Sequence, residues 1–148
     1  MNYLHQLAKT LDQNYAKVPA LPKGVNEFLV SVAPWLALVF GALAIVAGLG
    51  ALGLLTAFAP MAAVAGASQY AFAGLFAAVV LLLQGGVELL AFPSLKARKV
   101  KGWNLLYYSL LLSVLSSVVG LNVGSVVGAV VGFLLGYYFL YQIKSYYK

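Results

Sequence analysis

The sequence predicts an all-α integral membrane protein, in which four transmembrane helices form an antiparallel bundle preceded by an N-terminal amphipathic helix at the membrane interface. Three observations predict this architecture. Hydrophobic residues make up 64% of the 148 residues and charged residues 8%, whereas soluble domains are about half apolar and about a quarter charged. The charges gather in three short segments. Between those segments lie apolar stretches of roughly the 20 residues that a bilayer-spanning helix needs.

Residues 1–23 are predicted to form an amphipathic helix followed by a proline-containing linker. Apolar residues recur along one side of this segment at spacings of three and four: Leu4, Leu7, Ala8, Leu11, Tyr15 and Val18. That spacing is typical of a helix lying in the plane of the interface. Pro19 and Pro22 are expected to end the helix, because proline lacks the amide donor. The helix serves either as a surface anchor or as a docking site for a soluble partner.

Residues 24–148 are predicted to form the transmembrane domain. Gly24 to Ala33 is expected to approach the bilayer as a second short helix, with Pro34 starting or kinking the first span. The connection over residues 56–69 is either a simple loop or a re-entrant segment. The four spans are expected at about residues 34–55, 70–92, 103–119 and 123–141.

The basic residues predict the orientation of the spans. They fall before the first span, between the second and third, and after the fourth: Lys9, Lys17, Lys23, Lys96, Arg98, Lys99, Lys101, Lys144 and Lys148. Basic loops stay on the cytoplasmic side of a membrane. Both termini are therefore expected in the cytoplasm, in a multi-pass protein of the plasma membrane, which is the inner membrane if the source is bacterial.

A glycine stripe follows the fourth predicted span. Glycine stands at every fourth position: Gly120, Gly124, Gly128, Gly132 and Gly136. Because lipid supplies little hydrophobic drive between helices, small residues at this spacing favour association by letting two backbones approach closely. The stripe resembles the glycine zippers of pore-forming and other oligomeric membrane proteins. That resemblance implies helix–helix contact along this face.

Smaller stripes mark the other spans. Gly41 and Gly48 share one face of the first span, Gly74 lies in a similar row in the second, and serines from Ser109 onward follow the third. These faces either meet one another within a single four-helix bundle, or leave the fourth-span glycines free to pair with another copy or another subunit.

Glu88 is the one acidic residue inside a predicted span, and Gln84 lies one turn before it on the same face. Ionisable groups inside a membrane are costly and often mark function. Glu88 is placed near the inner interface, where it either pairs with Arg98 or Lys99 or forms an ion or proton site with Gln84.

Several function classes are not supported by this composition. The chain has no cysteine and one histidine, so neither a metal site nor a paired nucleophile and base is expected, and the protein is predicted not to be an enzyme and to hold no cofactor. No feature indicates nucleic-acid binding. The expected partners are the lipid bilayer, further copies of the chain or other membrane subunits. The expected function is non-catalytic assembly through small-residue helix faces. The alternative is a small cation- or proton-coupled transporter or channel that uses Glu88 and Gln84.

Overall fold

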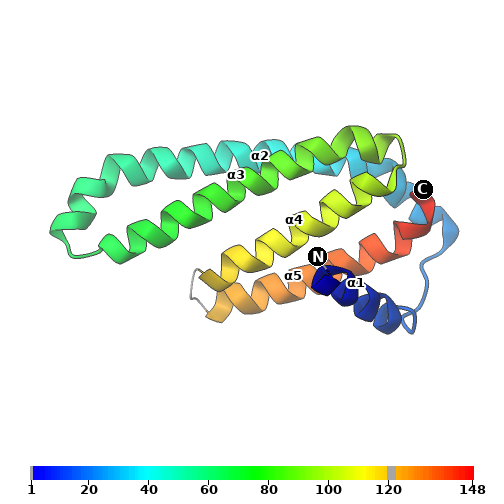
Figure 1. Cartoon of the computed structure of the whole chain (residues 1–148). Helices are drawn as coiled ribbons and strands as arrows, with labels where there is room; N and C mark the ends of the chain where they lie inside the picture. Colours follow the sequence, from blue (N-terminus) through cyan, green and yellow to red (C-terminus); the bar gives the residue numbers. More distant parts are fainter. Residues whose placement is uncertain (1, 120–122) are drawn as a thin grey trace.

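The computed structural model describes residues 2–119 and 123–148, with most of their side chains, and this part of the chain is helical with no strand (Figure 1). The prediction of an all-α fold is therefore confirmed. The elements are α1 (Asn2–Tyr15), α2 (Lys23–Val64), α3 (Ser68–Lys96), α4 (Val100–Val119), α5 (Val123–Ile143) and the short 3₁₀-helix η1 (Lys144–Tyr146).

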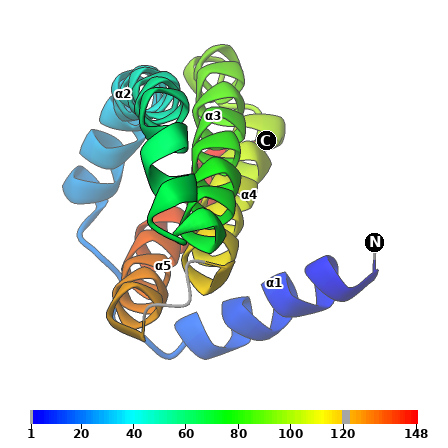
Figure 2. The same ribbon diagram turned by 90° about the vertical axis from the view of Figure 1, so that its left-hand side faces the viewer.

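The four long helices lie side by side in chain order. The most extensive packing joins α2 to α3, followed by α3 to α4 and α4 to α5, whereas α2 and α5 touch only slightly (Figures 1 and 2). The bundle is therefore an open arc, with a gap in its packing between its first and last long helices. One end of the bundle, here called the basic end, carries the α3–α4 turn with Arg98 and Lys99 and the C-terminal Lys148 (Figure 1).

Three helices are long and apolar enough to cross a membrane, namely Lys23–Val64, Tyr70–Lys96 and Val126–Tyr146 within the described residues. They bear out a membrane protein, and they contain the first two expected spans and most of the fourth. The remaining expected span, residues 103–119, lies in α4, which is not among these three helices within the described residues.

The surface of the helices agrees with lipid contact. Large apolar side chains such as Val46 (69% exposed) and Met61 (67% exposed) point outward along α2. A soluble protein rarely exposes contiguous apolar surface on this scale.

Helix α2 is longer at both ends than the sequence predicted. Residues 24–33 do not form a separate short helix, and Pro34 lies inside a continuous helix that begins at Lys23. The expected loop over 56–69 shrinks to a tight turn at Ala65–Ala67, where Gly66 has a φ of +69° that suits glycine. The alanine-rich sequence up to Val64 favours helix, and helix satisfies its backbone hydrogen bonds in lipid. The end of α2, which contains Pro60, bends away from the helix axis, as expected for proline (Figure 1).

The buried core lies toward the basic end of the bundle. Trp103 stacks on Tyr107 with ring centroids 5.9 Å apart, and Tyr137 meets Tyr107 edge-on at 5.6 Å. The Trp103 indole Nε1 donates a hydrogen bond of 2.7 Å to the Leu140 carbonyl. These aromatic contacts tie α4 to α5.

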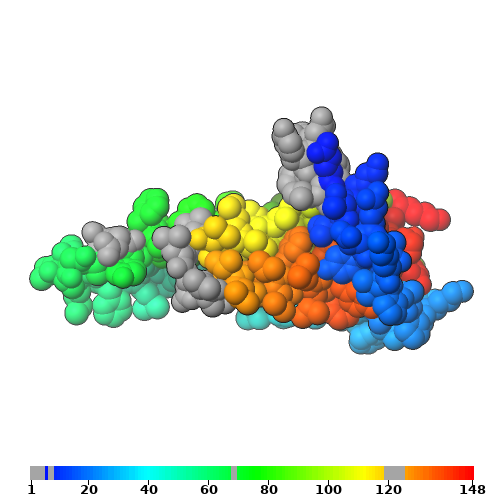
Figure 3. Space-filling model, turned by 90° about the horizontal axis from the view of Figure 1, so that it is seen from below, coloured from blue at the N-terminus to red at the C-terminus, as the bar shows by residue number. Residues whose placement is uncertain are grey.

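Helix α1 crosses this same region at a steep angle to the long helices (Figure 2). It stands out from the face formed by α5 and α4 (Figure 3). The Tyr15 hydroxyl donates to the Leu134 carbonyl at 2.8 Å and its ring packs on Tyr137, Tyr138 and Tyr141, so the end of α1 is held on α5.

Candidate functional site

The α2–α3 contact is built on glycine. A Cβ placed on Gly85 would lie 2.7 Å from the Gly41 carbonyl oxygen and 3.0 Å from the Ile45 amide nitrogen. A Cβ on Gly41 would in turn lie 3.0 Å from the Gly85 carbonyl oxygen. Real Cβ atoms do not approach a carbonyl oxygen to 2.7 Å, so the two backbones are closer than any residue other than glycine allows at this crossing.

The other glycines of this helix pair also meet neighbours. A Cβ on Gly48 would lie 2.8 Å from the Leu82 side chain, and one on Gly74 would lie 3.0 Å from the Leu55 side chain. Gly41, Gly48 and Gly74, three of the sequence-selected packing glycines, therefore sit at contacts inside the chain.

The α5 stripe divides into a packed part and an open part. A Cβ on Gly136 would meet the Leu110 side chain of α4 at 3.0 Å. Gly128 and Gly132 are exposed, and no atom of the described chain that could form a tertiary contact lies within 4 Å of their Cβ positions. Gly120 and the surroundings of Gly124 lie outside the described residues.

Glu88 is 8% exposed and faces α4. Its Oε1 accepts a hydrogen bond of 2.6 Å from the Ser109 hydroxyl and one of 3.2 Å from Gln84 Nε2. Its Oε2 is buried and has no hydrogen-bond partner in the described structure. The structure thus brings the two polar residues singled out from the sequence together, and adds Ser109, whose donor role the serine spacing alone did not indicate.

Arg98 and Lys99 lie elsewhere. Both are exposed in the α3–α4 turn, and within the described residues the one ion pair joins Lys144 to Asp12, so Glu88 has no basic partner there. Arg98 adopts a φ of +51°, and its carbonyl accepts a hydrogen bond of 3.0 Å from the amide of Lys148. The turn is therefore fastened to the C-terminus rather than to Glu88.

A second polar cluster joins α1 to the C-terminal end of the chain. Asp12 forms the ion pair with Lys144 and accepts a hydrogen bond of 2.9 Å from the Tyr137 hydroxyl. The Lys144 ammonium lies 4.9 Å from the centre of the Trp103 ring. Residues 132 positions apart carry no local spacing signal, so the sequence alone could not pair them.

Burial changes the titration of two tyrosines at this end of the molecule. It raises the pKa of Tyr15 above its ordinary value. It also raises the pKa of Tyr147, although the positive charge of Arg98 lowers that pKa in part. Burial disfavours the charged phenolate, which is why both pKa values lie above the ordinary value for tyrosine.

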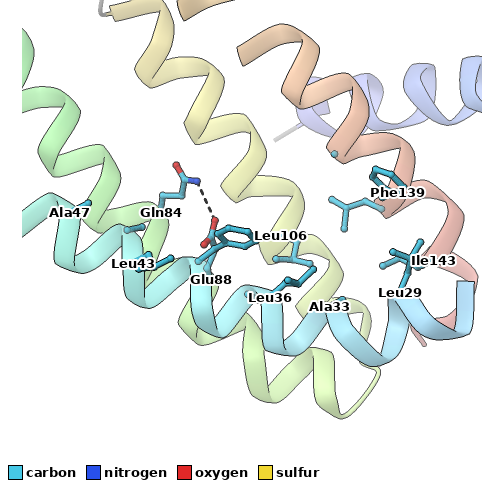
Figure 4. Close-up of a pocket in the computed structure, with 15 residues that line it drawn as sticks. Leu29, Ala33, Leu36, Leu43, Ala47, Gln84, Glu88, Leu106, Phe139 and Ile143 are labelled. Carbon is cyan, nitrogen blue, oxygen red and sulfur yellow. Dashed lines mark hydrogen bonds between the residues drawn. The ribbon is translucent and has the colours of Figure 1, made fainter. Parts of the chain in front are cut away.

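A cleft of about 670 Å³ lies between α2 and α5 (Figure 4). Its α2 wall includes Ala33 and Ala47, its α5 wall includes Phe139, and Gln84 and Glu88 of α3 lie between the two walls. Apart from those two residues the lining side chains are apolar. A second cleft of about 570 Å³ lies between the C-terminal half of α2 and the N-terminal half of α3, and its lining also includes Gln84.

The described residues contain no group of three histidine, cysteine or carboxylate side chains that could hold a metal ion. Comparison with models of protein families, with curated proteins and with solved structures gives no match to this chain.

Proposed function

We propose that the protein is a small non-catalytic membrane protein that assembles with a second copy of itself through the open glycine face of α5. In this proposal α2 to α5 cross the plasma membrane as an antiparallel four-span bundle, with both termini in the cytoplasm. The observation that carries the proposal is the exposure of Gly128 and Gly132, whose Cβ positions meet no neighbour in the described chain.

The other glycine contacts of the chain support this interpretation. Where α2 meets α3, Gly41 and Gly85 permit backbone-to-backbone contact, as small residues do in membrane helices generally. Glycine in a helix costs roughly 1 kcal/mol relative to alanine in water. Within the described chain, Gly128 and Gly132 make no contact that offsets this cost. Contact with another helix offsets it.

A second copy is the partner that fits a single stripe best. Two identical stripes brought together around a twofold axis are complementary to each other, because each presents the groove that the other needs. The twofold axis lies along the membrane normal, so both copies keep the same orientation. A different membrane subunit carrying its own small-residue stripe is the competing partner.

Disulfide trapping tests this proposal directly, because the natural chain has no cysteine. A disulfide requires Cα atoms about 4.4–6.8 Å apart, a distance reached between helices only at close contacts. Gly132→Cys is expected to cross-link two copies in native membranes, and Val127→Cys, exposed on a different side of α5, is the control. Efficient cross-linking at Val127 and none at Gly132 would refute the proposed face. Capture of a different protein at Gly132 would replace the second copy by another subunit.

The cation- or proton-coupled transporter remains a second candidate, and the unpartnered Oε2 of Glu88 favours it. A buried carboxyl oxygen without a donor is a place where a proton or cation can bind. Proton or cation flux into vesicles containing the purified protein, lost in Glu88→Gln, would favour transport over assembly alone. Absence of flux in the wild-type protein would remove this candidate.

A further inference from the structure

We infer that the α2–α5 cleft binds a single-chain amphiphile whose head group donates a hydrogen bond to Glu88. This inference goes beyond assembly and does not depend on it, since the cleft is formed within one chain. It rests on the shape of the cleft, its apolar lining and the buried carboxyl oxygen that has no partner.

The cleft is elongated and follows α2. On α2 the cleft runs from Leu29 to Ala47, which is about 27 Å at 1.5 Å per residue. An extended hydrocarbon chain can lie along a cleft of this length.

The lining determines what the body of the ligand must be. Alanines and leucines of α2 face Phe139 and Ile143 of α5 across the cleft (Figure 4). Cavities of about 300–1,000 Å³ with mostly apolar walls and a few polar groups are typical of small-molecule sites. An alkyl or isoprenoid body matches these walls.

The polar group determines the head of the ligand. Ser109 and Gln84 both donate to Oε1 of Glu88, and Oε2 is left with no donor. No basic residue pairs with Glu88 in the described structure. A buried acceptor without a partner is costly, so a ligand that brings a donor gains from filling this position. A hydroxyl or an ammonium group would supply it, whereas an ether or ester would not.

The test compares three isotopically labelled probes that share a dodecyl group and differ in the polar head, namely 1-dodecanol, dodecylamine and methyl dodecyl ether. Binding is measured to the protein in nanodiscs, with empty nanodiscs subtracting the share dissolved in lipid. The wild-type protein is expected to bind one equivalent of the alcohol and of the amine saturably. The ether is expected to bind on the order of tenfold more weakly, which corresponds to one hydrogen bond.

Two variants locate the binding. Glu88→Gln places an amide donor where the acceptor stood, so the preference for alcohol and amine over ether is expected to disappear. Ala44→Leu narrows the cleft and is expected to weaken all three probes, while Ala42→Leu, exposed and outside the cleft, is expected to leave them unchanged. The probe comparison in wild-type protein stands even where a variant fails to fold.

Equal binding of alcohol and ether, no saturable binding to the wild-type protein, or an unchanged preference in Glu88→Gln would overturn the inference. Cross-linking of a second copy to a cysteine at Ala47, which lines the cleft, would overturn it too, because a helix would then occupy the space. Measuring the same binding in Gly128→Leu separates this result from the assembly proposal, since Gly128 is not part of the cleft.

Discussion

Two adjacent glycines of α3 have opposite surroundings. A Cβ on Gly85 would run into the backbone of α2, whereas one on Gly86 would meet nothing within 4 Å. Both residues are glycines in an apolar helix, so the sequence alone does not distinguish them. The difference comes from the rotation of α3 against α2, which turns one of them into the contact and its neighbour away from it.

We expect Gly85→Ala to lower the free energy of unfolding by about 1–3 kcal/mol, the usual cost of overpacking. Gly86→Ala is the matched control, and is expected to leave that free energy unchanged or to raise it by up to about 1 kcal/mol through helix propensity. Denaturant-induced unfolding in detergent micelles measures both variants. Equal stabilities would show that the backbones do not meet at Gly85.

The Glu88 carboxyl depends on α4 for its shortest hydrogen bond. Ser109→Ala removes the hydroxyl 2.6 Å from Oε1 and is expected to lower the free energy of unfolding by about 1 kcal/mol, because the buried Oε1 loses the shorter of its two hydrogen bonds. Ser113→Ala is the control, since the Ser113 hydroxyl bonds to the Leu110 carbonyl of its own helix. The same unfolding assay compares them. A larger loss in Ser113→Ala than in Ser109→Ala would contradict the assigned role of Ser109.

At the scale of the helices, apolar length and charge placement account for most of what the sequence predicted. Each expected span lies within a helix of the structure, because about 20 apolar residues between charged segments have few alternatives to a helix in lipid. The extension of α2 to Val64 was missed, since an uncharged alanine-rich stretch was assigned to a connection. The expected turn at Asn122 lies outside the described residues.

Which side chains meet between two helices could not be predicted from the sequence, for a physical reason. Whether Glu88 meets Ser109 or a basic residue depends on how α3 and α4 are rotated about their axes. Apolar residues surround those helices on every side, so hydrophobic periodicity carries little rotational information in a membrane. The same ambiguity left open which glycines pack within the chain.

The docking of α1 on α5 depends on a small polar cluster. Asp12→Ala removes an acceptor of the Tyr137 hydroxyl and the ion-pair partner of Lys144. The ion pair contributes little to the docking free energy, because the Lys144 side chain is 42% exposed. Together these losses are expected to weaken docking by about 1–2 kcal/mol, or roughly 5- to 30-fold. Hydrogen exchange at the amides of α1 should quicken accordingly. Gln13→Ala, an exposed neighbour, serves as the control, and equal exchange in the two variants would show that α1 is held by other contacts.

For the whole molecule, orientation follows from where the basic residues lie. Ala65 and Ala97 directly follow α2 and α3, and both are exposed. Single cysteines at these positions form a matched pair for labelling of intact cells with a membrane-impermeant thiol reagent. The positive-inside rule predicts labelling of Ala65→Cys and protection of Ala97→Cys. The opposite pattern would invert the proposed topology.

The open arc of the bundle leaves two features unfilled by the chain itself, the α2–α5 cleft and the open glycines of α5. The first can hold an extended hydrocarbon chain, because it is elongated and its lining is mostly apolar. The second fits a helix, because small residues allow close backbone approach. Assembly through the α5 glycine face is the central claim, and it requires that the protein be an oligomer in a membrane.

The most direct test is the mass of the protein in nanodiscs, measured for the wild-type chain, Gly128→Leu and the control Val127→Leu. The wild-type protein and Val127→Leu are expected to contain two or more copies, and Gly128→Leu a single folded copy, because a leucine at Gly128 keeps the backbones apart at a cost of about 1–3 kcal/mol. Gly128 has no neighbour in the described chain, so the variant should fold as the wild-type protein does. A wild-type protein that is strictly monomeric, with a stability indifferent to Gly128→Leu, would contradict the claim.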